Sequence, residues 1–342
     1  MAEVKPSYDT NRKKLRDVVP LNSPLSMYIE PTRKCNLKCF YCMHSTRGNE
    51  NGVLAKTGFK LEDMDMDLYK KIVKDIMAFP NKTNRVCFSG LGDPLMNPRL
   101  PEMAKILRDA GFTARIDVIT NGLLLTPTMS EALVEAGVNR IQISVQALTS
   151  ERNREICGVP VDMEKYIQNI EYLYKNKKNT EIFIKIIDAN LSGGEEKDRF
   201  FNMFSHICDT IFVEHLVIME QQMGDHGGKV DATRNLNNEI VEKRFCCGVM
   251  FYFLQINIDG DTYPCSTPGL PTAFSMGNVR DNTLVEIWNA GKRNELIRKN
   301  LSIGYAKIPA CAKCSSCIAI ADDTEYVDDC REELLERFPA RG

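Results

Sequence analysis

Three cysteines near the N-terminus of this 342-residue chain have a spacing that suits metal chemistry. Cys35, Cys39 and Cys42 form a Cys-x3-Cys-x2-Cys pattern directly after a short apolar segment. Three thiolates can bind three irons of a 4Fe–4S cluster, which leaves the fourth iron open to a small molecule. A structural zinc site with His44 as fourth ligand is the alternative, because such sites need four ligands. The spacing after a strand favours iron over zinc.

A second group of cysteines lies toward the C-terminus. Cys246 and Cys247 precede a segment with an Asp259-Gly260 turn, which is typical of a β-hairpin, and Cys265 closes that segment. The N-terminus lacks an apolar signal core, so we expect a reducing cytoplasm, where clustered cysteines more often bind metal than form disulfides. The C-terminal tail carries four more cysteines, Cys311, Cys314, Cys317 and Cys330. For these four cysteines, a zinc knuckle is the alternative to an iron–sulfur cluster.

With these two groups, the sequence resembles the radical S-adenosylmethionine (radical SAM) superfamily with a C-terminal SPASM/Twitch auxiliary-cluster domain. In architecture and length it resembles the Twitch-type aminocyclitol dehydrogenase group. The glycine-rich segment departs from the family pattern at Leu91 or at Asp93, according to the alignment. The resemblance is carried by Tyr41 within the triplet, Ser89-Gly90-Leu91-Gly92-Asp93-Pro94, Thr120-Asn121-Gly122, Gly277-Asn278 and Leu284-Val285-Glu286-Ile287-Trp288.

The resemblance implies a set of residues that contact S-adenosylmethionine (SAM). Two members of this set, Ser144 and Arg154, also have an ordinary structural interpretation. Ser144 could be a hydroxyl at a strand end, and Arg154 could be a solvated arginine at the start of a helix. Gln146 stands where the family often has an acid. The set comprises Tyr41 beside the adenine, Gly90, Gly92 and Asp93 at the methionine amino group, Asn121 in the turn after the third strand, Ser144 at the ribose and Arg154 at the methionine carboxylate.

The resemblance also implies one auxiliary 4Fe–4S cluster in the C-terminal region. Cys246 is a possible substitute for Cys247. A second auxiliary cluster that uses Cys317 and Cys330 is the alternative, although the long cysteine run of full SPASM domains is absent. The expected ligands are Cys247, Cys265, Cys311 and Cys314.

The expected reaction begins with reductive cleavage of SAM to a 5′-deoxyadenosyl radical, which abstracts a C–H hydrogen. The substrate is expected to be a small polar metabolite, a sugar or an aminocyclitol, because the 34 residues before Cys35 leave no room for a leader-peptide domain. The auxiliary cluster would then accept an electron, and a flavodoxin- or ferredoxin-type protein would supply the reductant. Three alternatives stay open: an epimerase of a sugar or peptide, a peptide- or protein-modifying maturase, and a metal-stabilised scaffold without activity.

Four residues are candidates for proton or hydrogen transfer to the substrate. Cys157 would serve an epimerase as hydrogen donor, although the packing of a small buried side chain is the favoured interpretation. Arg152, Glu214 and His215 would serve a dehydrogenase as base, and the last two end a predicted strand. Ordinary polar strand-end roles remain open for each of them.

Alternating apolar segments predict the elements that position these residues. Six strands separated by helices favour a parallel sheet in an α/β partial (βα)6 barrel of TIM type, with functional residues at the carboxyl ends of the strands. A β-hairpin plus helix completes the small C-terminal iron–sulfur domain. The predicted strands are 27–30, 85–88, 114–120, 140–145, 181–187 and 210–215, the helices 68–77, 99–110, 130–136, 163–175, 196–204 and 284–299, and the hairpin arms 251–258 and 261–264.

The composition sets limits on partners and divides the chain into segments. With 44 basic and 46 acidic residues the net charge is −2, which gives no electrostatic footprint for nucleic acid or an anionic membrane. We find no apolar run long enough to cross a bilayer. The predicted segments are a polar arm over 1–22, the radical SAM barrel over 23–218, a linker or substrate loop over 219–244, and the auxiliary-cluster domain over 245–342.

Overall fold

The computed structural model describes residues 1–7, 12–217, 231, 233–312, 314–319 and 322–339. Its strands form one ten-stranded sheet in the order β1-β7-β6-β5-β4-β3-β2-β8-β9-β10. The pairs from β1 to β8 are parallel, whereas β8 with β9 and β9 with β10 are antiparallel. The strands are β1 (Glu3–Val4), β2 (Ser26–Ile29), β3 (Arg85–Phe88), β4 (Arg115–Thr120), β5 (Arg140–Val145), β6 (Glu181–Ile187), β7 (Thr210–Glu214), β8 (Phe253–Ile256), β9 (Asp261–Tyr263) and β10 (Gly277–Asn278).

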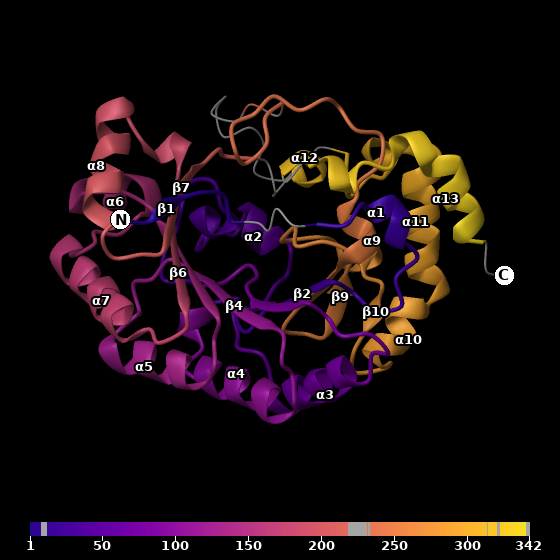
Figure 1. The fold of residues 1–342 in the computed structure, drawn as a ribbon, viewed down its shortest axis with the longest axis horizontal. Helices are drawn as coiled ribbons and strands as arrows, with labels where there is room; N and C mark the ends of the chain where they lie inside the picture. The colour runs from indigo at the N-terminus through magenta and orange to yellow at the C-terminus, as the bar shows by residue number, and fades with distance from the viewer. Residues whose placement is uncertain (8–11, 218–230, 232, 313, 320–321, 340–342) are drawn as a thin grey trace.

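Helices cover the outer side of the parallel strands, as Figure 1 shows for α3, α4, α5 and α7. This βα alternation confirms the predicted α/β partial barrel, and the predicted bounds of β3, β5 and β6 match the structure. The helices are α1 (Leu15–Val18), α2 (Val53–Lys56), α3 (Met66–Met77), α4 (Leu100–Asp109), α5 (Pro127–Glu135), α6 (Ser150–Cys157), α7 (Met163–Asn176), α8 (Gly194–Phe204), α9 (Val249–Tyr252), α10 (Leu284–Asn289), α11 (Gly291–Ile303), α12 (Ser316–Ala319) and α13 (Arg331–Arg337).

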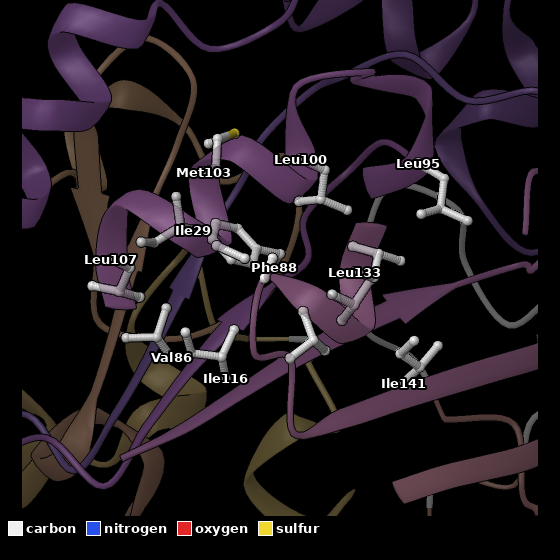
Figure 2. Packing of buried hydrophobic residues seen from close by; sticks show 14 of the residues in the cluster. Ile29, Val86, Phe88, Leu95, Leu100, Met103, Leu107, Ile116, Leu133 and Ile141 are labelled. Carbon is white, nitrogen blue, oxygen red and sulfur yellow. The ribbon is translucent and has the colours of Figure 1, made fainter. Parts of the chain in front are cut away.

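The core lies between the strands and these outer helices. Ile29, Val86 and Ile116 of the strands meet Leu100 and Met103 of α4, and all of these side chains are fully buried (Figure 2). Burying each such side chain contributes about 1.5–3 kcal/mol. This apolar layer fixes the strands, so that their carboxyl ends and the loops that follow them have defined positions.

Local signals set where the outer helices begin. The Asp65 side chain accepts hydrogen bonds from the amides of Asp67 and Leu68 at the start of α3. Helix α5 begins earlier than predicted, because Thr126 caps it and Pro127 occupies its first position, where the fixed φ of proline suits a helix. These caps satisfy amides that would otherwise lack a partner.

The C-terminal region departs from the predictions in two places. The single helix expected over 284–299 is wrong, because Ala290 adopts an extended conformation and separates α10 from α11. The expected hairpin arm over 251–258 begins as helix α9 and contributes only β8 to the sheet. Strand β8 pairs in parallel with β2, so the hairpin extends the barrel sheet.

The expected polar arm over 1–22 is in part structured. Strand β1 pairs with β7 at one edge of the sheet, while Leu15 of α1 packs with the C-terminal residues. Much of the predicted linker over 219–244 lies outside the described residues. No helix in the described part of the chain is long and apolar enough to span a membrane.

Candidate active site

The first cysteine group lies on the loop that follows β2, and α6 supports this loop. The amides of Lys38 and Phe40 donate hydrogen bonds to the carbonyls of Cys157 (2.9 Å) and Ile156 (2.9 Å) at the end of α6. Cys39 is buried, whereas Cys35 and Cys42 are half-buried. The loop is therefore held by backbone bonds, with the thiols at its two ends partly accessible.

The chemistry of these thiols fits an iron–sulfur cluster. Burial raises the pKa of Cys35 to about 11, and burial together with neighbouring Cys157 and Cys35 raises the pKa of Cys39. Thiols in this setting keep their protons in the absence of metal, because burial and the repulsion between neighbouring thiolates disfavour the charged form. A bound metal cation would stabilise the thiolates and so remove the protons. No three His, Cys, Asp or Glu side chains in the described ranges converge closely enough for a single metal ion. The ligand set therefore stays a prediction.

The alternative zinc ligand, His44, is buried beside this loop. Burial lowers the pKa of its imidazole to about 4, and the ring interacts with the backbones of Leu91 and Arg33. His44 thus lies between the cysteine loop and the glycine-rich turn that follows β3.

That glycine-rich turn packs directly on the backbone before Cys35. A Cβ atom on Gly92 would lie 2.4 Å from the Thr32 carbonyl oxygen and 2.5 Å from that of Lys34. A Cβ atom on Gly90 would lie 2.6 Å from Cγ of Glu30. Both glycines are therefore required for this close approach, which accounts for their place in the turn.

Asp93 ties three loops together at the carboxyl ends of the strands. Its buried carboxylate accepts hydrogen bonds from Oγ1 of Thr120 (2.9 Å) and from the amides of Asn121 (2.7 Å) and Leu95 (3.0 Å). Asn121 in turn donates from Nδ2 to Oδ1 of Asn36 (2.6 Å) in the cysteine loop. Asp93, expected at the methionine amino group, and Asn121, expected in the turn after the third strand, thus position the loop through protein contacts.

Tyr41 is held by a glutamine whose role the sequence did not indicate. Its hydroxyl donates to Oε1 of Gln146, which also receives the Cys39 thiol (3.6 Å). Gln146 itself donates from Nε2 to the carbonyl of Ser144 (2.9 Å). A side chain two residues after Ser144 therefore fixes both the aromatic residue and one cysteine of the triplet.

A cavity of about 1020 Å³ adjoins the cysteine loop. One end is lined by Tyr41 and Cys42 of the loop after β2 and by Ser89 and Gly90 of the turn after β3. The lining residues near the second cysteine group are Ser266, Pro268 and Ser316. Because Ser266 and Ser316 follow and precede cysteines in the sequence, the cavity reaches from one cysteine group to the other.

Glu214 and His215 line this cavity, as the strand-end position predicted. Glu214 forms an ion pair with Lys185 of β6. Nδ1 of His215 lies 2.6 Å from Oδ2 of Asp188. Lys185 and Asp188 were not among the residues predicted from the sequence, although a charged residue within Ile-rich β6 and an acid just after this strand are visible signals.

The other candidates are placed elsewhere and are not among the described residues that line the cavity. Cys157 is fully buried behind the cysteine loop, and its thiol donates to the Asn153 carbonyl (2.9 Å). Arg152 pairs with Glu155 (2.7 Å), and Arg154 is exposed on the same helix. Ser144 is half-buried on β5. The buried position of Cys157 on α6, in a cluster with Leu37 and Ile156, fits the packing role that the sequence favoured over hydrogen donation.

Five thiols, rather than four, gather in the second cysteine group. Burial raises the pKa of Cys247 well above its usual value, and the four neighbouring thiols add to the shift. The thiols of Cys246 and Cys330 instead face the carbonyls of Asn300 (3.6 Å) and Val327 (3.5 Å). Cys317, expected as a leftover, therefore lies near the four expected ligands, and the ligand set itself stays a prediction. The four neighbours of Cys247 are Cys317, Cys265, Cys314 and Cys311.

Comparisons with known proteins agree with both cysteine groups. Residues 29–190 match the family model of the Radical SAM superfamily, and residues 246–317 match the SPASM iron–sulfur cluster-binding domain. The tungsten-containing aldehyde ferredoxin oxidoreductase cofactor-modifying protein of Pyrococcus furiosus is 25% identical over 84% of this chain and 86% of its own. The AdoMet-dependent heme synthase of Methanosarcina barkeri is also 25% identical, over 81% of this chain and 85% of its own.

Solved structures share the fold at low identity. BtrN, in complex with AdoMet and 2-DOIA, gives a TM-score of 0.56 at 17% identity and covers 84% of this chain and 91% of its own. The enzyme anSMEcpe with bound AdoMet gives a TM-score of 0.58 at 18% identity, over 92% of this chain and 97% of its own. These domains imply 4Fe–4S clusters and bound SAM as cofactors. The chain belongs to the radical SAM superfamily and carries a SPASM domain after its radical SAM domain.

Proposed function

We propose that this radical SAM enzyme oxidises a small metabolite by abstracting a C–H hydrogen and passing an electron toward the C-terminal cysteine group. When bound, the reduced cluster at Cys35, Cys39 and Cys42 and its SAM supply the 5′-deoxyadenosyl radical. The observation that carries the proposal is the single cavity that reaches from Cys42 to the surroundings of the second cysteine group. A substrate in that cavity lies between the two cofactor sites.

The protein side chains in the cavity suit the proton transfer that an oxidation requires. Removal of hydrogen and an electron from a carbinol carbon must be matched by loss of the hydroxyl proton. Glu214, paired with Lys185, presents a carboxylate to the cavity, and His215 lies beside it on the Asp188 carboxylate. Either group is a suitable proton acceptor within reach of a bound hydroxyl.

The size of the cavity favours a small substrate over a peptide. A volume of about 1020 Å³ must accommodate SAM as well as the substrate. Sites for one drug-sized ligand occupy about 300–1,000 Å³. We therefore assign a metabolite of the size of a sugar or an aminocyclitol, with a flavodoxin- or ferredoxin-type protein as the reductant.

Anaerobic reconstitution tests this proposal. We expect about eight irons per chain, falling to about four in the Cys35/Cys39/Cys42 triple alanine variant. With dithionite and SAM, the wild type forms 5′-deoxyadenosine and the triple variant does not. About four irons in both proteins, or zinc in place of iron, would contradict the proposal. Solvent deuterium in the product would indicate epimerisation instead of oxidation.

A further inference from the structure

Four neighbouring strands each place one basic residue on the inner face of the sheet. These residues, which we term the basic row, are Arg85 of β3, Arg115 of β4, Arg140 of β5 and Lys185 of β6. Arg85 pairs in register with Arg115, and Arg140 pairs with Asp117 and with Glu181. Side chains alternate between the faces of a strand, so these positions share one face.

The carboxylate that neutralises part of this row lies beneath it. Asp117 contacts Nε of Arg85 (2.6 Å) and Nε of Arg115 (3.1 Å), and its side chain is only 2% exposed. The two arginine side chains are 24% and 26% exposed and line the cavity, whereas Asp117 is not among its described lining residues. The ion pairs thus fix both guanidinium groups while the surface presented to the cavity stays basic.

A tyrosine completes the donor set. Nη2 of Arg85 donates to the hydroxyl of Tyr28 (3.3 Å), which also lines the cavity. Burial raises the pKa of Tyr28 to about 12, so the phenol keeps its proton and can donate it. Planar guanidinium groups and a hydroxyl donor are the groups that recognise carboxylate and phosphate oxygens.

We propose that Arg85, Arg115 and Tyr28 bind an anionic group of the substrate, a carboxylate or a phosphate. This inference rests on the proposed function, because it identifies the substrate class of the same cavity. The lining of the cavity also includes the apolar side chains of Leu25, Ile119 and Ile187. Apolar walls lower the local dielectric and strengthen the attraction between the arginines and an anion.

The length of β3 sets the shape of the ligand. Arg85 begins this strand, and Ser89, which lines the SAM end of the cavity, directly follows it. Four residues of strand span about 13 Å at 3.3 Å per residue. The basic site and the SAM end of the cavity thus lie at opposite ends of β3, and the long arginine side chain covers part of the distance between them. A sugar or cyclitol that carries an acidic substituent would use the basic site, and a free neutral sugar would not.

Calorimetric titration of the reconstituted holoenzyme with SAM bound tests the inference. The probes are glucose, glucuronate and glucose 6-phosphate, each at low and high salt. We expect at least one anionic probe to bind about tenfold or more tighter than glucose, with a difference that shrinks at high salt. Preference for glucuronate identifies a carboxylate, and preference for glucose 6-phosphate identifies a phosphate. Equal affinities for the three probes, or no binding by any of them, would overturn the inference.

Variants separate recognition from folding. Arg115→Gln removes one guanidinium, and the double variant Arg115→Gln/Asp117→Asn also removes the carboxylate that it would leave underneutralised. We expect both to lose the preference for the anionic probe. Lys105→Gln on the outer helix α4 keeps it, because Lys105 is exposed and pairs with Asp109. An unchanged preference in a folded double variant would contradict the proposed site.

A readout independent of the probes separates this inference from the proposed function. The iron content and the melting temperature report a folded, loaded enzyme, and 5′-deoxyadenosine formation without substrate is expected to be unchanged in the control variant Lys105→Gln. Loss of anion binding in Arg115→Gln at an unchanged iron content and melting temperature supports the site. A wild type that binds the anion without cleaving SAM would refute the radical function and leave the anion site in place.

Discussion

Replacing Gly92 with alanine is expected to displace the cysteine loop. The added Cβ would meet three backbone atoms, at 2.4 Å from the Thr32 oxygen, 2.5 Å from the Lys34 oxygen and 2.8 Å from the Arg33 carbonyl carbon. Real Cβ contacts lie near 3.4–4 Å, so one segment must move by about 1 Å. Because backbone atoms cannot rotate away as a side chain can, the segment before Cys35 has to shift.

The energetic cost follows from this overlap and from one hydrogen bond. Overpacking of a buried position costs about 1–3 kcal/mol. The shift also strains the bond from the Asp93 amide to the Lys34 carbonyl, which is 2.8 Å long, and a bond of this kind contributes about 0.5–1.5 kcal/mol. We therefore expect a lower melting temperature and, more specifically, a displaced Cys35.

The assay is iron and acid-labile sulfide per chain after anaerobic reconstitution, together with the thermal midpoint. Gly92→Ala is expected to lose the iron of the first cluster, about four per chain, and to stop forming 5′-deoxyadenosine. Gly90→Ala is expected to be milder, because its Cβ meets the Glu30 side chain rather than backbone. Gly194→Ala is the matched control, since nothing lies within 4 Å of its added Cβ.

One result would refute this reasoning about the turn. If Gly92→Ala kept its full iron content, its 5′-deoxyadenosine formation and a melting temperature equal to that of Gly194→Ala, the close packing between turn and loop would not control the cluster. A variant that melts earlier but keeps all its iron would show that the strain is absorbed away from Cys35.

Three further predictions concern other parts of the site. Cys247→Ala should lower the iron content by about four per chain, whereas Cys330→Ala should leave it unchanged, because its thiol faces a backbone carbonyl. Glu214→Gln should abolish product formation but keep substrate-independent SAM cleavage, which product and 5′-deoxyadenosine assays distinguish. Tyr41→Phe should lose about 1 kcal/mol of stability with its bond to Gln146 but keep SAM affinity, whereas Tyr41→Ala should weaken SAM binding in a titration.

The strands could be predicted well because their apolar segments are short and clearly bounded. Arg85–Phe88 and Glu181–Ile187 both begin at a charged residue and continue mainly as β-branched or aromatic side chains, with Cys87 and Lys185 as the exceptions. The pairing of β8 with β2 was not predictable in this way. This pairing joins segments more than two hundred residues apart. It depends on the backbone hydrogen-bonding groups of β2 on the side away from β3, and no local sequence pattern predicts which strand will pair with them.

The functional residues that lie close together in the sequence were predictable. Those whose role depends on contacts between distant segments of the chain were not. The cysteine triplet and the strand-end pair of Glu214 and His215 follow from spacing and position. Arg85 and Arg115 look like solvated charges at strand starts, yet they face the cavity because the open barrel has a polar interior. The sequence left two roles open for Cys157, packing and hydrogen donation, and only its place on α6 beneath the loop shows how it packs.

One buried carboxylate connects the segments that carry the two cysteine groups and so fixes their relative position. Glu30, which follows β2 and is 2% exposed, accepts hydrogen bonds from Nε of Arg33 (3.0 Å) and from the amides of Leu91 (2.9 Å) and Ile258 (3.2 Å). These partners belong to the cysteine loop, the glycine-rich turn and the hairpin that leads to Cys265. Burial raises the pKa of Glu30, so its charged form depends on all three contacts. The spacing between the two cysteine groups is therefore set by a continuous sheet and this junction, and not by the linker that separates them in the sequence.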